Sequence, residues 1–74
     1  MKIKLSSVEQ IEELVKLCES FKEDIDLSSG SVVVDAKSFM GVTGMGIGKD
    51  LKITINSSDD TVKNLFYSKV NEIL

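Results

Sequence analysis

The chain has 74 residues and a net charge of −3, with no histidine, arginine, proline or tryptophan and only one cysteine. This length predicts one small domain, residues 1–74, that buries roughly 60% of its unfolded surface and has no room for a deep catalytic cleft. The missing histidine and the single cysteine exclude Ser-His or Cys-His catalysis, phosphohistidine chemistry, imidazole-ligated metals, a Cys-cluster zinc site and an internal disulfide, and no cofactor is expected.

The first segments predict a strand followed by an amphipathic helix. Residues 2–5 alternate between lysine and apolar side chains, which is typical of a short half-buried strand. The pair Ser7 and Gln10 matches a helix capping box, and Ser6 with Glu9 offers the alternative register. Apolar residues then recur at three- and four-residue spacing, at Val8, Ile11, Leu14, Val15, Cys18 and Phe21. This spacing predicts a helix of about four turns.

The middle of the chain predicts a β-hairpin. Residues 24–27 alternate again, and residues 28–31 form a turn in which Gly30 is free to take a positive φ. Residues 32–34 are all valine, which favours a strand. Because Val33 can face either side of the sheet, the register of the hairpin stays open.

Residues 37–50 hold four of the five glycines. A short helix from about Ser38 to about Gly44, with Ser38 as its N-cap, fits the first half of this segment, and the later glycines predict a loop. Residues 51–56 alternate as a strand with one buried face. Residues 57–59 can end that strand and cap a second amphipathic helix that runs to the C-terminus.

This order of elements is strand, helix, strand, strand, short helix, strand, helix. Strands with one polar face leave that face in water and carry their helices on the other. The sequence therefore predicts a two-layer α+β sandwich built on an antiparallel sheet.

The glycine-rich segment suggests a phosphate loop, but its spacing excludes one. A P-loop needs a glycine five positions before its Gly-Lys pair, where Thr43 stands, and a serine or threonine after the lysine, where Asp50 stands. The dinucleotide-binding pattern fails as well. The glycines are best interpreted as a helix stop and turns, although an amino acid or anion site at residues 44–48 is an alternative.

Ser38 and the apolar residues after it are the main candidates for a functional surface. A phosphate on a serine that begins a helix would add nearly two negative charges there, whereas a plain N-cap is the alternative interpretation. The apolar residues that follow are Phe39, Met40, Val42, Met45 and Ile47. A domain of this size cannot bury all five, so some should be exposed and mark a partner site.

Other site and partner classes find little support. Cys18 lies on the apolar face of the first helix and is expected to be buried and unreactive. The negative net charge argues against nucleic acid. No 18-residue apolar run and no signal-peptide pattern are present, so no membrane partner and a cytoplasmic location are expected.

The segment around Ser38 resembles HPr, the phosphocarrier of the bacterial sugar phosphotransferase system. The resembling residues are Lys37-Ser38-Phe39-Met40-Gly41-Val42, then Gly46, Gly48-Lys49-Asp50 and Ile53-Thr54-Ile55. The resemblance runs from about Phe21 through this strand, and the order of elements extends it to Leu74. It implies an open-faced sandwich of four antiparallel strands and three helices.

The resemblance breaks where HPr carries its phosphoryl group. HPr uses a histidine at the start of its first helix, completed by a nearby arginine and proline. Counting back from Phe21 places Ser7 at the histidine position, Glu9 at the arginine position and Gln10 at the proline position. Because Glu9 would repel a phosphoryl group, phosphocarrier activity is not expected. With no histidine, no arginine and a chain too short for a catalytic cleft, no enzyme activity is expected either.

The resemblance instead implies regulation. Many HPr proteins of Firmicutes carry a second phosphorylation site on the serine that matches Ser38, and the Crh proteins lack the histidine and keep that serine. The family's docking surface beside this serine corresponds to Phe39, Met40 and Met45, although Thr43 replaces a commonly apolar residue.

The resemblance thus implies a non-catalytic regulatory or adaptor domain in phosphotransferase-linked carbon regulation. Ser38 is its candidate switch, and an HPr kinase or a transcriptional regulator is the kind of protein partner expected. Two alternatives stay open: a small-molecule-binding regulatory domain, and an HPr-like remnant with no retained partner.

Overall fold

The computed structural model describes residues 1–74 and contains the predicted order of elements. The elements are β1 (Lys2–Ile3), α1 (Val8–Glu19), β2 (Ile25–Ser29), β3 (Val32–Asp35), α2 (Phe39–Met45), β4 (Leu51–Ile55) and α3 (Asp60–Ile73). None of the three helices is both long and apolar enough to span a membrane.

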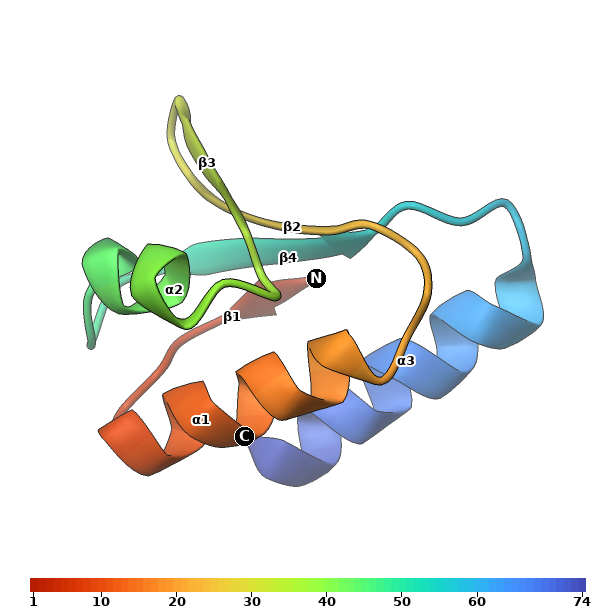
Figure 1. The fold of residues 1–74 in the computed structure, drawn as a ribbon, viewed down its shortest axis with the longest axis horizontal. Helices are drawn as coiled ribbons and strands as arrows, with labels where there is room; N and C mark the ends of the chain where they lie inside the picture. Colours follow the sequence, from red (N-terminus) through yellow and green to blue (C-terminus); the bar gives the residue numbers. More distant parts are fainter.

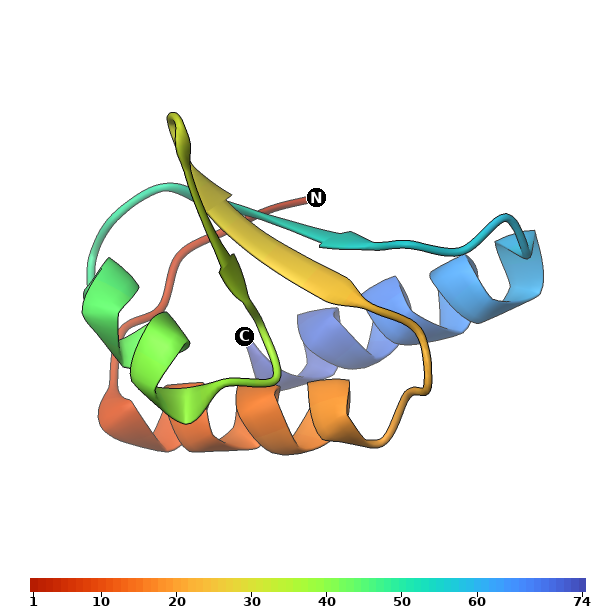
Figure 2. The ribbon, with the colours of Figure 1, turned by 45° about the horizontal axis from the view of Figure 1, so that its top comes forward.

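The four strands form one sheet in the order β1-β4-β2-β3, with every neighbouring pair antiparallel. Helices α1 and α3 lie side by side against one face of this sheet, and the other face is uncovered (Figures 1 and 2). The alternation along β4 explains this arrangement, because Leu51, Ile53 and Ile55 are buried while Lys52 is exposed. The predicted two-layer α+β sandwich is confirmed.

The β2–β3 hairpin has a register that the sequence left open. Ser29 pairs with Val32, so the turn contains only Gly30 and Ser31, and Gly30 has φ +59°. A two-residue turn with glycine first suits the right-handed twist of the strands. Leu27 opposes Val34 on the core side of the sheet, so Val33 points to the open face. The tip of the hairpin projects away from helices α1 and α3 (Figure 2).

Helix α1 begins as predicted and ends earlier than predicted. Its N-cap is Ser7, whose Oγ accepts a hydrogen bond from the Gln10 backbone N–H at 3.2 Å. The Gln10 side chain reaches back to Ser6 rather than to Ser7, because its Oε1 accepts from both the N–H and the hydroxyl of Ser6 at 2.8 Å. Twelve residues make about 3.3 turns. Phe21 therefore lies after the helix, with its ring edge-on to Phe66 at 5.2 Å.

The core lies between the sheet and the helices and contains no polar residue. Its sixteen buried residues are Ile3, Leu5, Ile11, Leu14, Val15, Cys18, Ile25, Leu27, Ala36, Val42, Met45, Leu51, Ile53, Ile55, Phe66 and Val70. One of them corrects an expectation: Met45, predicted as part of a docking surface, is only 5% exposed. Val42 and Met45 are three positions apart and so share the helix face that packs on the core.

Candidate functional site

Ser38 begins α2, as its sequence context predicted. Its backbone is extended (φ −96°, ψ 112°), and its Oγ accepts a hydrogen bond from the Gly41 N–H at 3.2 Å. The hydroxyl is exposed, and its hydrogen is free. A Cβ on residue 41 would lie 3.4 Å from Ser38 Oγ and 3.4 Å from the Val34 side chain, so glycine there keeps this cap uncrowded.

The charged neighbours of Ser38 are engaged with the backbone. The Lys37 ammonium donates to the carbonyl of Phe21 at 2.7 Å, just after the end of α1. The Asp35 carboxylate accepts from the Lys37 N–H at 2.9 Å. The one ion pair of the structure joins Lys4 and Asp50 at 3.5 Å. No cation of the chain is therefore held at Ser38 Oγ.

Apolar side chains beside Ser38 form an exposed surface, here called the α2 patch. It consists of Phe39 (43% exposed) and Met40 (84%), and Ile47 (49%) is exposed two residues after the end of α2. Thr43 is exposed on the same helix, and its hydroxyl donates to the carbonyl of Phe39 at 2.7 Å. The structure thus brings Ser38, Phe39 and Met40 together, whereas Met45 lies beneath them in the core.

Ser7 lies at the start of α1, half-buried, with its hydroxyl oxygen used for capping. The loop after α2 is attached to the loop before α1, because the Gly48 N–H donates to the carbonyl of Leu5 at 2.8 Å. The start of α1 and helix α2 therefore lie on the same side of the molecule (Figures 1 and 2). Glu9 is exposed in the first turn of α1, and no base contacts Ser7.

The glycines of the segment 44–48 end helix α2 and allow the turns that follow it. Gly46 ends α2 with φ +91°, and Gly48 has φ +81°, a region that other residues rarely adopt. The surface of the protein has two hollows, and neither is lined by this segment.

Cys18 is fully buried on α1. Burial raises the pKa of its thiol to about 12, and this effect outweighs the opposite influence of Lys37. A thiol that stays protonated is neither a nucleophile nor a metal ligand at neutral pH.

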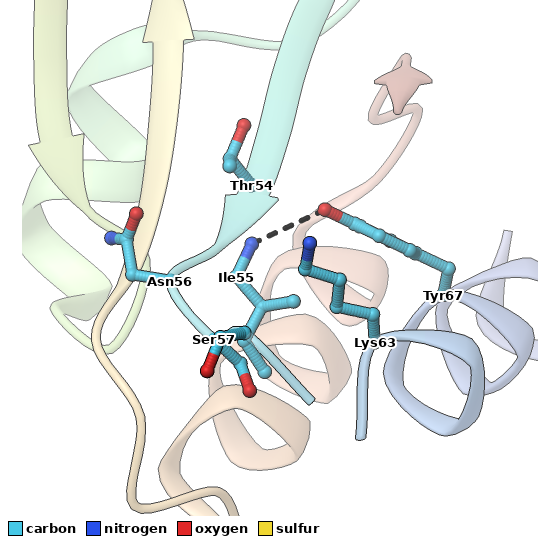
Figure 3. A pocket seen from close by; sticks show the side chains of 7 residues that line it. Thr54, Ile55, Asn56, Ser57, Lys63 and Tyr67 are labelled. Carbon is cyan, nitrogen blue, oxygen red and sulfur yellow. Dashed lines mark hydrogen bonds between the residues drawn. The ribbon is translucent and has the colours of Figure 1, made fainter. Parts of the chain in front are cut away.

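The sequence analysis did not predict one group of polar residues that the structure brings together at the end of β4. Figure 3 shows a hollow at the end of β4, where Lys63 and Tyr67 of α3 approach Ile55 and Ser57. The signal was present as a lysine and a tyrosine four positions apart, which places them on one helix face. Their approach to the end of β4 depends on the packing of α3, which the local pattern does not specify.

A comparison with protein families matches residues 9–66 to the family described as "PTS HPr component phosphorylation site". The matched segment contains Ser38 and the α2 patch. It begins two residues after Ser7, so it does not test what Ser7 replaces.

Three solved structures resemble the chain over nearly its whole length. The phosphocarrier protein HPr from Bacillus anthracis strain Ames has 21% sequence identity and a TM-score of 0.75, covering 100% of this chain and 93% of its own. HPr-C-His from Thermoanaerobacter tengcongensis has 22% identity and a TM-score of 0.70, covering 96% and 93%. Crh from Bacillus subtilis, described as an intertwined dimer with a swapped domain, has 19% identity and a TM-score of 0.70, covering 96% and 82%. At these identities the likeness concerns the fold.

Proposed function

Because the chain belongs to the HPr family, whose members are phosphocarriers of the phosphotransferase system, we propose that it is a non-catalytic, regulatory or adaptor member of that family. Ser38 is the phosphorylation switch, and the α2 patch is the docking surface for a protein partner. The observation that carries this proposal is the exposed Ser38 hydroxyl beside Phe39 and Met40, which are exposed as well.

A phosphate on Ser38 would change the charge of this surface. It would add nearly two negative charges and three strong acceptor oxygens. Lys37 is already bound to the Phe21 carbonyl, and Asp35 adds a further negative charge nearby. The chain itself therefore does not neutralise the phosphate. A partner with basic side chains around an apolar pocket would recognise the phosphate and the α2 patch together.

We place Ser7 at the position of the family's histidine, and this placement argues against phosphoryl relay. A serine hydroxyl is a weak nucleophile unless a base activates it. The chain has no histidine, and no basic side chain contacts the Ser7 hydroxyl. Glu9, two residues after Ser7 and exposed in the first turn of α1, would repel an approaching phosphoryl group. The protein is accordingly proposed to receive a phosphate as a signal and not to pass it on.

The rival functions have weaker support. A small-molecule site at Gly44–Gly48 would need a hollow there, and both hollows of the surface have other linings. A remnant without a partner would not account for Phe39 and Met40 being exposed next to each other beside Ser38, because neighbouring exposed apolar side chains typically mark an interaction site.

Incubation with ATP and an HPr kinase tests the switch, with intact mass and peptide mass spectrometry as the measurement. We expect a single phosphate, located on Ser38 and absent from Ser38→Ala. The matched control is Ser68→Ala, which removes an exposed hydroxyl from α3 and should be phosphorylated normally. Absence of phosphate, or phosphate on another residue with Ser38 unmodified, would refute the proposed switch.

A further inference from the structure

The hollow at the end of β4 has a volume of about 720 Å³ and is separate from the surface proposed for docking. Helix α2 and the start of α3 lie on opposite sides of the molecule (Figure 1). The hollow is lined by Thr54, Ile55, Asn56, Ser57, Ser58, Lys63 and Tyr67. All of these except Ile55 carry a polar group, and none is a carboxylate.

Tyr67 completes the edge of the sheet in this hollow. Strand β1 pairs with the first residues of β4. The last hydrogen bonds between the two segments join Met1 and Ile53, and beyond them this edge of β4 has no neighbouring strand. The next N–H on the same edge belongs to Ile55, and it donates to the Tyr67 hydroxyl oxygen at 3.3 Å. Because the oxygen accepts this bond, the Tyr67 O–H hydrogen is left for another acceptor.

Ser57 also lines the hollow, and its hydroxyl is hydrogen-bonded in the same way as that of Tyr67. Its Oγ accepts from the Asp59 N–H at 3.1 Å, so its own hydrogen has no acceptor in the chain. The half-buried Lys63 makes neither an ion pair nor a side-chain hydrogen bond. Lys63 and Tyr67 extend from α3 in the same direction, toward the end of β4 (Figure 3).

The Lys63 ammonium and the Tyr67 hydroxyl hydrogen thus line one hollow and have no acceptor in the chain. We propose that this hollow binds a compact oxyanion, the carboxylate or phosphoryl group of a small molecule, between Lys63 and Tyr67. Such a group brings several acceptor oxygens and a negative charge, and charge-assisted hydrogen bonds are the stronger kind. The binding site is independent of the function proposed for Ser38.

Nearby negative charges limit the size of the ligand. Asp59 and Asp60 begin α3, and Asp26 is held by the Asn56 amide at 3.2 Å. The whole chain carries a net charge of −3. A long polyanion would be repelled by these carboxylates, whereas a single small oxyanion can be bound by Lys63 and Tyr67 alone.

Titration with inorganic phosphate and, separately, with acetate tests the site at constant ionic strength set by potassium chloride. Amide NMR is the measurement, and the Ile55 amide is the reporter because it donates to Tyr67. Lys63→Met removes the ammonium and keeps an apolar stem. Lys69→Met, an exposed lysine of the same helix outside the hollow, makes the same charge change and is the matched control.

We expect a saturable shift of Ile55 with at least one of the two anions. Lys63→Met should weaken the binding about tenfold or more, and Lys69→Met should leave it unchanged. Saturation by phosphate alone assigns a phosphoryl group, and saturation by acetate alone assigns a carboxylate. A shift that never saturates with either anion, or equal weakening by the two lysine variants, would overturn the proposal.

Discussion

Cys18 and Met45 illustrate what burial does to a side chain that could otherwise act at the surface. Cys18 is fully buried, and desolvation raises the pKa of its thiol to about 12 from a usual value of 9.0. Met45 is buried, as is Val42 three positions before it, so its side chain is not part of the exposed surface. The position of Cys18 followed from its helical spacing. The burial of Met45 also follows from helical spacing, because Met45 lies three positions after the buried Val42. The resemblance to HPr had instead assigned Met45 to the docking surface.

The raised pKa of Cys18 predicts a loss of stability in alkaline solution. The folded protein keeps the thiol proton up to pH about 12, whereas the unfolded chain releases it above pH 9.0. The folded state binds more protons in this window, so the free energy of unfolding falls as pH rises, by up to about 1.4 kcal/mol per pH unit from this group.

Urea unfolding between pH 8 and about pH 11 measures this effect, with Cys18→Ala as the control because other groups titrate in the same range. The wild type should lose more stability across the window than Cys18→Ala. Equal slopes for the two proteins would show that Cys18 is not linked to folding.

Turns and helix ends separate what local sequence determines from what it leaves open. Strand β4 was predicted almost to its ends because its apolar and polar residues alternate without interruption. Helix α1 ends earlier than its apolar spacing suggests, because Phe21 continues the pattern while packing on Phe66 from outside the helix. Three consecutive valines carry no alternation, so the pairing of β3 becomes visible only in the sheet.

Two glycines provide a matched pair of substitutions. Gly30 turns the hairpin with φ +59°, so Gly30→Ala should lower the free energy of unfolding by about 1 kcal/mol. Gly44 lies within α2, has no positive φ and has open space around a new Cβ, so Gly44→Ala should raise it by about 0.5–1 kcal/mol. Chemical unfolding of both variants checks the signs, and a stabilised Gly30→Ala would contradict the observed turn.

The assembled molecule creates relations that no single segment contains. The loop after α2 is bonded to Leu5 beside the start of α1, and the packing of α3 brings Lys63 and Tyr67 to the end of β4. The sequence predicted that Ser38 begins a helix and that apolar residues next to it are exposed, because all of these residues lie in one short segment. It could not predict the hollow at β4, which is built from a strand end and a helix face set by tertiary packing.

Docking through the α2 patch predicts an unequal response to two similar substitutions. Phe39 and Leu65 are both large, apolar and about half exposed, at 43% and 51%, but Leu65 lies on α3. Phe39→Asp should sharply reduce capture of the protein by its partner and cost about 1 kcal/mol or less of stability. Leu65→Asp should leave capture unchanged. Loss of capture in both variants, or in neither, would rule out the α2 patch as the docking surface.

The most direct test of whether this chain receives a phosphate without relaying one is exposure to the phosphoenolpyruvate-driven donor of the phosphotransferase system. Intact mass is measured at neutral pH and again after mild acid, with the HPr of Bacillus anthracis as the positive control. We predict that the control gains an acid-labile phosphoryl group and that this chain, which has no histidine, gains none. An acid-labile adduct on this chain would contradict the account.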